Sequence, residues 1–343
     1  MHVVPPRAAR FPERPLLFGA SVVWVGLVLS ACLERPVPHV PGSAGRRDVA
    51  TENTRCVSCH AEQGREWASS NHALSFRHET FQAALAIEPL PFCVACHAPL
   101  SPRSSPSREA EQVGVGCVSC HSFSAGKADR VSEAKCVACH EFPFPGSSRL
   151  LQRTASERAA AHVRVLCTEC HMRPTGDGAS RHTDHRVFAS RDTELVRSAA
   201  TVEVRRDGEW LVVVFRRAAT GHAFPTGDVF RRLKLVVVAD GVARVVVLGR
   251  HVTRDGETDT RPFADGSAET VARAFVGSAE RVTYEVLYER VAHPVEPSGV
   301  EAVLDGKVEL ARGELPALRA SFAPAEGGRT ARQPPAVRLT IAP

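Results

Sequence analysis

The stretch Cys117-Val-Ser-Cys120-His121 carries the pattern that decides how this chain is organised. The same spacing occurs four more times, at Cys56, Cys59 and His60, at Cys93, Cys96 and His97, at Cys136, Cys139 and His140, and at Cys167, Cys170 and His171. Cys-x-x-Cys-His is the attachment signature of c-type haem, in which both cysteines bind the macrocycle and the histidine is the proximal iron ligand. Ten of the 11 cysteines belong to these motifs, so the sequence predicts five covalently bound haems.

Three other uses of paired cysteines have to be weighed against haem. Zinc ribbons and redox dithiols also use Cys-x-x-Cys, but neither requires a histidine directly after the second cysteine. A disulfide framework is typical of small secreted domains, whereas 343 residues are enough to bury a core without cross-links. The repeated histidine therefore favours haem.

The N-terminus has the layout of an export signal. Arg7, Arg10 and Arg14 precede an uncharged apolar run at 16–31, which is short for a membrane span. Leu29-Ser30-Ala31-Cys32 resembles the lipobox of bacterial lipoproteins, whose cysteine is lipidated and becomes the mature N-terminus. We therefore expect residues 1–32 to be a lipoprotein-type signal peptide and the protein to be exported, on the periplasmic or cell-surface side. An uncleaved single-span anchor and an ordinary signal remain open alternatives.

The next 18 residues are rich in proline and glycine. Residues 33–50 contain Pro36, Pro38, Pro41, Gly42 and Gly45, which is typical of an extended tether. Such a tether would hold the following domain away from a membrane reached through the lipid at Cys32.

All five motifs lie within residues 51–190. Only 14 residues separate His121 from Cys136, so the third and fourth haems should be close neighbours. Five large apolar macrocycles in about 140 residues leave little room for a side-chain core, so the haems should form the core of a mostly helical domain. Two of its helices are predicted at 66–78 and at 155–165.

Cysteine is absent beyond residue 191, and segments rich in β-branched residues replace the motifs. We expect strands at 201–204, 210–215, 233–238, 242–248, 282–287 and 337–341. Asp207-Gly208 and Asp240-Gly241 are hairpin signals between them. The predicted fold class is therefore α+β, with a haem-packed helical domain at 51–190 followed by a β-sandwich-like domain at 191–343.

The distal iron ligands should be mostly histidine. Met1 and Met172 are the only methionines, and Met172 directly follows proximal His171, so it cannot reach the opposite face of the same haem. Nine histidines outside the signal and the motifs are available for five positions. Our candidates for distal ligands are His72, His162, His182, His185 and His222. Because methionine raises haem potentials, bis-histidine ligation predicts low potentials.

Several of these histidines lie in patterns that carry a family resemblance. Trp67-x-x-Ser70-x-His72-Ala73 follows the first motif, and Cys167-x-x-Cys170-His171-Met172-x-Pro174 is followed by Asp184-His185-Arg186. Gly221-His222-x-Phe224-Pro225-Thr226-Gly227 precedes Arg231-Arg232-Leu233. The first two patterns resemble the multihaem c-type cytochromes related to the ammonia-oxidiser tetrahaem cytochrome, and the third resembles the β-rich C-terminal part of related bacterial multihaem cytochromes. The resemblance, which spans about residues 51–240, implies electron transfer through closely packed haems, with His72, His185 and His222 as distal ligands, although this chain has five motifs instead of four.

The charge balance argues against nucleic acid as a partner. The formal net charge of +5 leaves out the haem propionates, which arginine pairs well, and Arg181, Arg186, Arg231 and Arg232 are our candidates for that pairing. Two functions remain. The first is an electron carrier that exchanges electrons with redox partner proteins and is not an enzyme. The alternative is a multihaem reductase, of the nitrite or hydroxylamine type, in which one iron keeps an open position.

Overall fold

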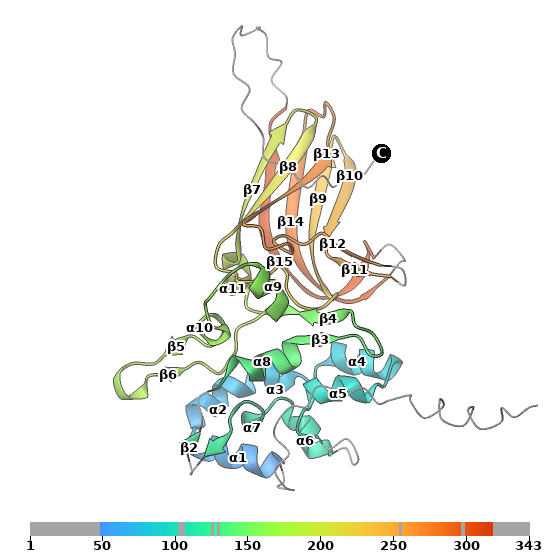
Figure 1. Cartoon of the computed structure of the whole chain (residues 1–343). Coiled ribbons are helices and arrows are strands. Elements are labelled where there is room, and N and C mark those ends of the chain that lie inside the picture. Colours follow the sequence, from blue (N-terminus) through green and yellow to red (C-terminus); the bar gives the residue numbers. More distant parts are fainter. Residues whose placement is uncertain are drawn as a thin grey trace, which may run out of the picture. The chain divides into compact units, whose positions relative to one another are not determined.

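Helices occupy the first part of the described chain and long strands the second (Figure 1). The computed structural model describes residues 49–101, 107–124, 127–128, 131–253, 256–295 and 299–317. The proposed signal peptide, Cys32 and all but two residues of the proposed tether therefore lie outside the described residues. The mixed α+β class predicted from the sequence is confirmed.

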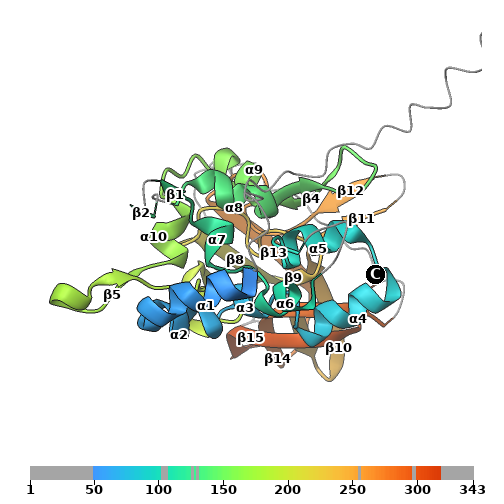
Figure 2. The ribbon, with the colours of Figure 1, turned by 90° about the horizontal axis from the view of Figure 1, so that it is seen from below.

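The helical part consists of short helices joined by tight connections. The helices are α1 (Val49–Cys59), α2 (Ala61–Ala68), α3 (Asn71–Leu74), α4 (Glu79–Ile87), α5 (Pro91–His97), α6 (Arg108–Val113), α7 (Cys117–Cys120), α8 (Glu133–His140), α9 (Thr154–Ala160) and α10 (Cys167–His171). Three small antiparallel ribbons lie among them: β1 (Phe123–Ser124) with β2 (Lys127–Ala128), β3 (Glu141–Pro143) with β4 (Leu150–Arg153), and β5 (Pro174–Thr175) with β6 (His182–Thr183). In the view of Figure 2, α7 lies between α1 and α8, and it contacts both.

Each of the five motifs lies on a helix, namely α1, α5, α7, α8 and α10. Residues three and four apart share a face of a helix, so one helical turn presents two cysteines and then the histidine to the same side. The histidine is the last residue of α5, α8 and α10, and it directly follows the last residue of α1 and α7. This local geometry suits attachment of one planar group per helix.

The helical part has almost no apolar core of its own. Among its described residues, up to residue 190, the buried hydrophobic side chains are Ala73, Ala98, Ala110 and Val113, all of them small. Burial of such small groups contributes little to stability, since the gain is about 25 cal/mol per Å² of apolar area. The finding agrees with the expectation that the haems supply the core.

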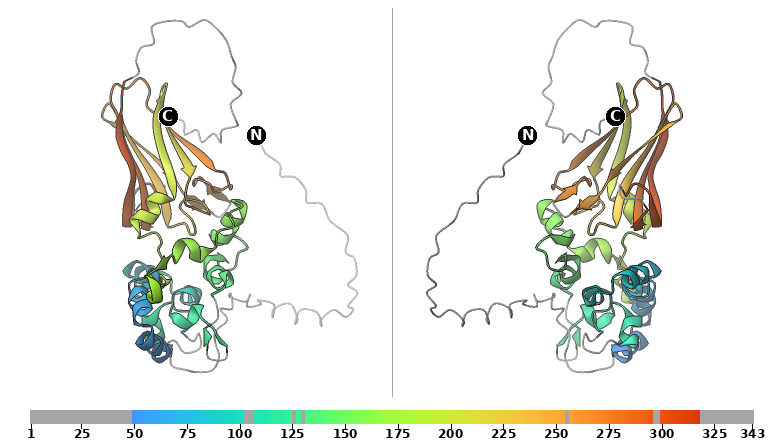
Figure 3. Two further views of the ribbon diagram at one scale, coloured as in Figure 1. Left: turned by 90° about the vertical axis from the view of Figure 1, so that its left-hand side faces the viewer. Right: turned by 90° about the vertical axis from the view of Figure 1, so that its right-hand side faces the viewer.

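The second part contains two antiparallel sheets around one hydrophobic core. One sheet has the order β13-β8-β7, with β7 (Ala200–Asp207), β8 (Trp210–Arg217) and β13 (Glu269–Phe275). The other has the order β10-β9-β14-β15, with β9 (Arg231–Ala239), β10 (Val242–Leu248), β14 (Val282–Pro294) and β15 (Ala302–Leu315). Both sheets contribute to the core, for example Leu211 and Phe215 from one and Leu235 and Val286 from the other. The side views show the two sheets as separate layers (Figure 3).

Two smaller elements complete this part. Helix α11 (Thr193–Ser198) precedes β7, and Asp192 caps it by accepting a hydrogen bond from the Leu195 backbone N–H at 2.7 Å. Strands β11 (Arg250–Val252) and β12 (Glu257–Asp259) form a ribbon at the end of β10. No helix in the described part of the chain combines the length and the apolarity that crossing a bilayer requires.

Five of the six predicted strand segments are strands, and both hairpins occur. Asp207 pairs with Trp210 across the first turn, and Ala239 pairs with Val242 across the second. At the second turn Asp240 and Gly241 both have positive φ, of 45° and 84°, as a type I′ turn requires. The segment 337–341 lies outside the described residues. Strands β13 and β15 were not predicted, because their apolar residues are diluted by charged and small ones.

Two predicted helices are shorter than expected. The segment 66–78 is interrupted after Ala68, because the Ser70 side chain accepts a hydrogen bond from the Ala73 backbone N–H at 3.1 Å and so begins a new helix, α3. The segment 155–165 ends as a helix at Ala160, and His162 has a left-handed φ of 55°. A left-handed residue cannot continue an α-helix, so His162 lies in the connection between α9 and α10.

Candidate haem-ligand sites

Three motif histidines each face a second imidazole. His171 faces His222 with 6.3 Å between ring centroids and 14° between ring planes. His121 faces His185 at 6.2 Å and 26°, and His140 faces His72 at 6.4 Å and 56°. The three distances agree although the partner histidines come from different parts of the chain.

These distances fit one metal atom between the two rings. Metal–nitrogen bonds to imidazole are about 2.0–2.1 Å long, so two imidazoles on opposite sides of one metal have centroids roughly 6.3 Å apart. A direct hydrogen bond between the two rings would bring the centroids to roughly 5 Å, since the nitrogens would then be about 2.9 Å apart. The residues of these three sites therefore fit a six-coordinate haem iron.

Three of the paired imidazoles are held in the form that binds metal. Desolvation by the surrounding protein lowers the pKa of His140 to about 4, with nearby His72 adding to the effect. Burial also lowers the pKa of His222 to about 4 and lowers the pKa of His72. These rings are therefore neutral at physiological pH, and neutral imidazole is the metal ligand.

Backbone carbonyl groups fix which ring nitrogen is left for a metal. The Nδ1 atom of His171 donates to the Phe188 carbonyl at 2.5 Å, and that of His222 donates to the Ala223 carbonyl at 2.9 Å. In the second motif, His97 Nδ1 donates to the Ser75 carbonyl at 2.7 Å. Because a carbonyl oxygen can only accept, the proton lies on Nδ1 and the Nε2 lone pair is available to iron.

One short segment serves two of the paired sites. The buried Asp184 carboxylate accepts from the backbone N–H of Arg186 at 2.8 Å and from its guanidinium Nε at 2.9 Å. Arg186 also lies over the Phe188 ring, 4.7 Å from its centroid. The segment thus fixes His185, which faces His121, and the Phe188 carbonyl, which orients His171. Sequence reasoning identified His185 and missed the contribution of Phe188.

The remaining two candidate ligands lie in other surroundings. His182 Nε2 is 3.0 Å from Glu66 Oε1, and the Ser180 carbonyl and Glu66 raise the pKa of this imidazole. Glu66 Oε2 also accepts from the His185 backbone N–H at 2.9 Å. Within the described part of the chain, neither His182 nor His162 forms a ring pair with a motif histidine. Their assignment as distal ligands stays a prediction.

The first two motifs lack such an imidazole pair among the described residues. His60 is exposed. His97 stacks against the Phe81 ring, with centroids 3.7 Å apart and planes 9° apart. A phenyl ring cannot ligate iron, so Phe81 supplies an apolar wall at this site, a contact that the sequence did not reveal.

The cysteine side chains show which motifs are neighbours. A hydrogen bond that the Cys139 thiol donates to Cys96 is the main cause that raises the pKa of Cys139, and one that Cys167 donates to Cys136 has the same effect on Cys167. Burial raises the pKa of Cys117 to about 11, with Cys56 beside it. Cys120 and Cys139 also interact. The fourth motif is therefore next to the second, third and fifth, and the expected proximity of the third and fourth agrees with the structure.

The described residues contain no group of three or more His, Cys, Asp or Glu side chains arranged to hold a metal ion by themselves, as a tetrahedral zinc site would require.

Three of the four arginines expected to pair with propionates have a carboxylate partner within the protein. Arg231 binds Asp228 at 2.7 Å, and buried Arg232 binds Glu289 at 2.7 Å. Arg186 binds Asp184, as described above. The pairing of these arginines with propionates stays a prediction.

Comparisons with known proteins agree with the motif assignment. The family model described as cytochrome c554 and c-prime matches residues 55–122, and the model described as cytochrome c3 matches residues 109–181. A penta-haem cytochrome c552 from Thermochromatium tepidum has a similar fold, with a TM-score of 0.58, 18% identity, and coverage of 78% of this chain and 98% of that chain. No curated protein matches the chain.

Taken with the five motifs, the two family matches support a multihaem c-type cytochrome, a class that binds haem covalently and transfers electrons. More particularly, the matched segments are similar to cytochrome c554 and cytochrome c3, while the link to the ammonia-oxidiser cytochrome stays a resemblance. Cytochromes of this class are typically exported to the periplasm.

Proposed function

We propose that this chain is an electron carrier with five c-type haems, one on each motif, and that most of these haems have two histidine ligands. The observation that carries the proposal is the common 6.2–6.4 Å separation of His121 from His185, His140 from His72, and His171 from His222. The penta-haem neighbour supports the count of five.

The haem iron, when bound, supplies the chemistry by cycling between its ferric and ferrous states. The protein residues hold it in a fixed environment. Imidazoles such as those of His171 and His222 would hold it in both states, and carbonyl groups such as that of Phe188 keep the rings from turning. The thiols of the fourth motif lie beside those of the second and fifth, which places neighbouring attachment points close together.

Haem stoichiometry and spin state test this proposal together. Intact mass and the pyridine haemochrome assay should give five haems per chain, and the Cys93→Ala/Cys96→Ala variant should give four. The ferric spectrum should be largely low-spin. Three or fewer haems in the wild-type protein, or a predominantly high-spin spectrum, would contradict the proposal.

A reductase with one open-coordination haem is the second candidate. The observation in its favour is the second motif, where Phe81 and not an imidazole stacks on His97. A reductase should show a stoichiometric high-spin haem and rapid reoxidation of the reduced protein by nitrite or hydroxylamine. Slow or absent reoxidation by both compounds would exclude the reductase and favour the electron carrier.

The cellular setting follows from the sequence and is part of the proposal. We infer a lipoprotein signal at 1–32, lipidation of Cys32, a tether at 33–50, a haem domain at 51–190 and a β-sandwich-like domain at 191–343. The partners would be redox proteins, with the membrane reached through the lipid. Cys32→Ser should abolish incorporation of labelled fatty acid and release the protein from the membrane fraction, whereas a soluble, unlipidated wild type would exclude the anchor.

A further inference from the structure

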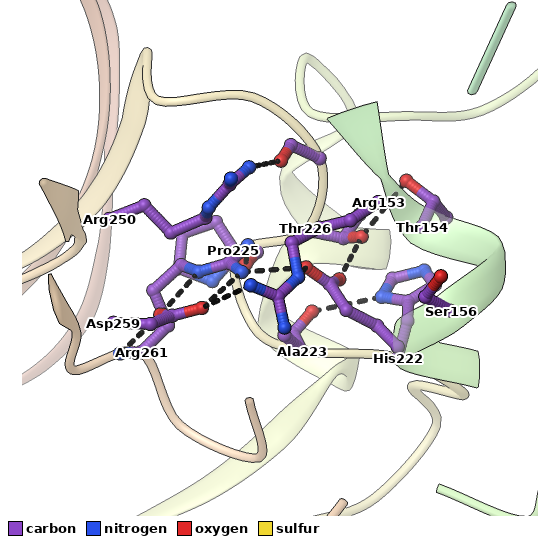
Figure 4. A network of polar contacts seen from close by, with 12 residues as sticks. Arg153, Thr154, Ser156, His222, Ala223, Pro225, Thr226, Arg250, Asp259 and Arg261 are labelled. Atoms are coloured by element: carbon purple, nitrogen blue, oxygen red, sulfur yellow. Dashed lines mark hydrogen bonds and ion pairs between the residues drawn. The ribbon is translucent and has the colours of Figure 1, made fainter. Parts of the chain in front are cut away.

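A buried ionic network lies directly behind the loop that carries His222 (Figure 4). The side chains of Glu157, on α9, and Arg261, which follows β12, are both fully buried, and Arg261 Nη2 lies 2.6 Å from Glu157 Oε1. Arg261 also binds Asp259, with 2.7 Å between Nη2 and Oδ2. Nothing in the transfer of electrons requires an ion pair at this place, so its role has to be sought in what it contacts.

The network holds the His222 loop through two adjacent residues. Arg261 Nη1 donates to the Pro225 carbonyl at 2.8 Å. The Thr226 hydroxyl donates to Glu157 Oε2 at 2.6 Å. The Phe224 backbone N–H donates to the Pro262 carbonyl at 2.9 Å, so the chain next to Arg261 adds a third attachment.

The same network holds the segment that leads to the opposite ligand. Glu157 lies on α9, and α10, with Cys167, Cys170 and His171, is the next helix along the chain. Arg250 extends the hold to β4, since it donates to the Leu150 and Leu151 carbonyls at 2.6 and 2.7 Å and to the Gly227 carbonyl at 2.9 Å. The same ionic network therefore contacts the His222 loop and the segments that precede His171 in the chain.

The network is balanced in charge, which explains how it can be buried. Arg153, Arg250 and Arg261 face Glu157, Glu257 and Asp259, and ion pairs connect all six. Buried ion pairs seldom add much stability, because desolvation opposes the attraction, but they fix geometry well where their hydrogen bonds are made, as those of the Arg261 guanidinium are. The pair Glu157–Arg261 is therefore better suited to fixing the position of the His222 loop than to stabilising the fold.

We propose that Glu157 and Arg261 are positioning residues that hold His222 at ligating distance opposite His171. The inference rests on the proposed ligation by His222. Neither residue touches the imidazole itself, so each acts through Pro225 and Thr226.

The test compares four variants of the holoprotein and one combination of two of them. Arg261→Met removes the hold on Pro225, and Glu157→Gln/Arg261→Met removes it without leaving a buried carboxylate unpaired, which protects against misfolding. Arg216→Met is the matched control, because Arg216 also pairs with two carboxylates, Glu203 at 2.6 Å and Glu269 at 2.9 Å, but on the exposed face of β8. His222→Ala defines the spectrum of the haem without its distal ligand.

In the two Arg261 variants we expect up to about one haem equivalent to become high-spin and bind carbon monoxide. Added imidazole should restore the low-spin spectrum, since the iron has lost a ligand and the rest of the fold is intact. Combining Arg261→Met with His222→Ala should open no more haem than His222→Ala alone, and Arg216→Met should match the wild type.

Three outcomes would overturn the inference. If the folded Arg261 variants keep the wild-type spectrum while His222→Ala changes it, the network does not position His222, and the proposed ligation survives. If more haems open than in His222→Ala, or imidazole fails to restore the spectrum, the effect is general loosening. If His222→Ala itself leaves the spectrum unchanged, ligation by His222 fails and the inference fails with it.

Discussion

Ser75 and His97 exchange two hydrogen bonds. His97 Nδ1 donates to the Ser75 carbonyl, and the Ser75 hydroxyl donates to the His97 carbonyl, each at 2.7 Å. The same hydroxyl lies 2.8 Å from the His72 carbonyl. The turn after α3 therefore orients His97 of the second motif, and it is bonded to His72 of α3, which faces His140 of the fourth motif. Two proposed haem sites depend on one turn.

Gly114 allows this turn to pack closely. A Cβ atom there would lie 2.7 Å from the His72 carbonyl oxygen and 2.8 Å from Ser75 Oγ. We expect Gly114→Ala to displace His72 and open about one haem to carbon monoxide. Gly178→Ala is the control, because Gly178 also has a positive φ but has nothing within 4 Å of its Cβ position. Both variants should lose about 1–3 kcal/mol because their positive φ disfavours a side chain. Equal haem spectra in the two would show that the packing at Gly114 does not matter.

Removing one partner of the buried pair Arg232–Glu289 should strongly destabilise the second sheet. Both side chains are buried, and Arg232 also donates to the Gly299 and Val300 carbonyls. Arg232→Met leaves Glu289 unpaired and should lower the free energy of unfolding by about 3–5 kcal/mol. Arg216→Met, in an exposed pair, should cost less than about 1 kcal/mol. Urea unfolding followed by the β-sheet circular dichroism signal measures both, and similar losses would refute the distinction.

Asp240 should contribute acid-sensitive stability. Its carboxylate accepts backbone hydrogen bonds from Arg281 at 2.8 Å and Glu280 at 3.0 Å, and these bonds lower its pKa. A lowered folded pKa gives stability that is present above the unfolded pKa of about 3.9 and lost as the pH falls through the folded value. Asp240→Asn tolerates the positive φ but removes the charge. The wild type should be the more stable at pH 7, and the difference should shrink below about pH 4. A difference that stays constant with pH would contradict this.

Midpoint potentials should be low. Methionine ligation raises haem potentials, and Met172 directly follows proximal His171, where its backbone N–H caps α10 by donating to the Thr168 carbonyl at 2.9 Å. A spectroelectrochemical titration should place most of the haems below zero against the hydrogen electrode. A majority well above zero would argue against histidine on both sides.

The sequence predicts the attachment sites and much of the β part, because both depend on residues that are close together in the chain. Cys-x-x-Cys-His needs one helical turn, and Asp240-Gly241 needs only its own two positive φ angles. The pairing of a motif histidine with a second histidine depends on residues that are far apart in the chain. His72 and His140 are 68 positions apart, and the break at Ser70 that turns α3 away from α2 depends on a single side-chain cap. Periodicity over 66–78 alone therefore favoured one continuous helix.

The buried ion pairs could not be predicted from the sequence either, because their partners are far apart in the chain. Glu157 and Arg261 are separated by 104 positions, and a lone glutamate in an alanine-rich helix has the pattern of a solvated residue. Arg232 and its carboxylate partner Glu289 are 57 positions apart, so the sequence did not reveal this pair either. Only the fold brings these charges together.

The scarcity of buried side chains in the helical part has a consequence for biogenesis. Ordering a residue costs about 1–2 kcal/mol of backbone entropy, and four small buried side chains cannot offset that for more than a hundred residues. This stretch of polypeptide therefore has no reason to collapse before its macrocycles are attached, while the two sheets already have a core of their own. We therefore expect the attachment machinery to receive an open, accessible chain that does not have to be unfolded first. A chain without its haems would keep this part unfolded and open to proteolysis. Haem attachment would then also decide which chains survive.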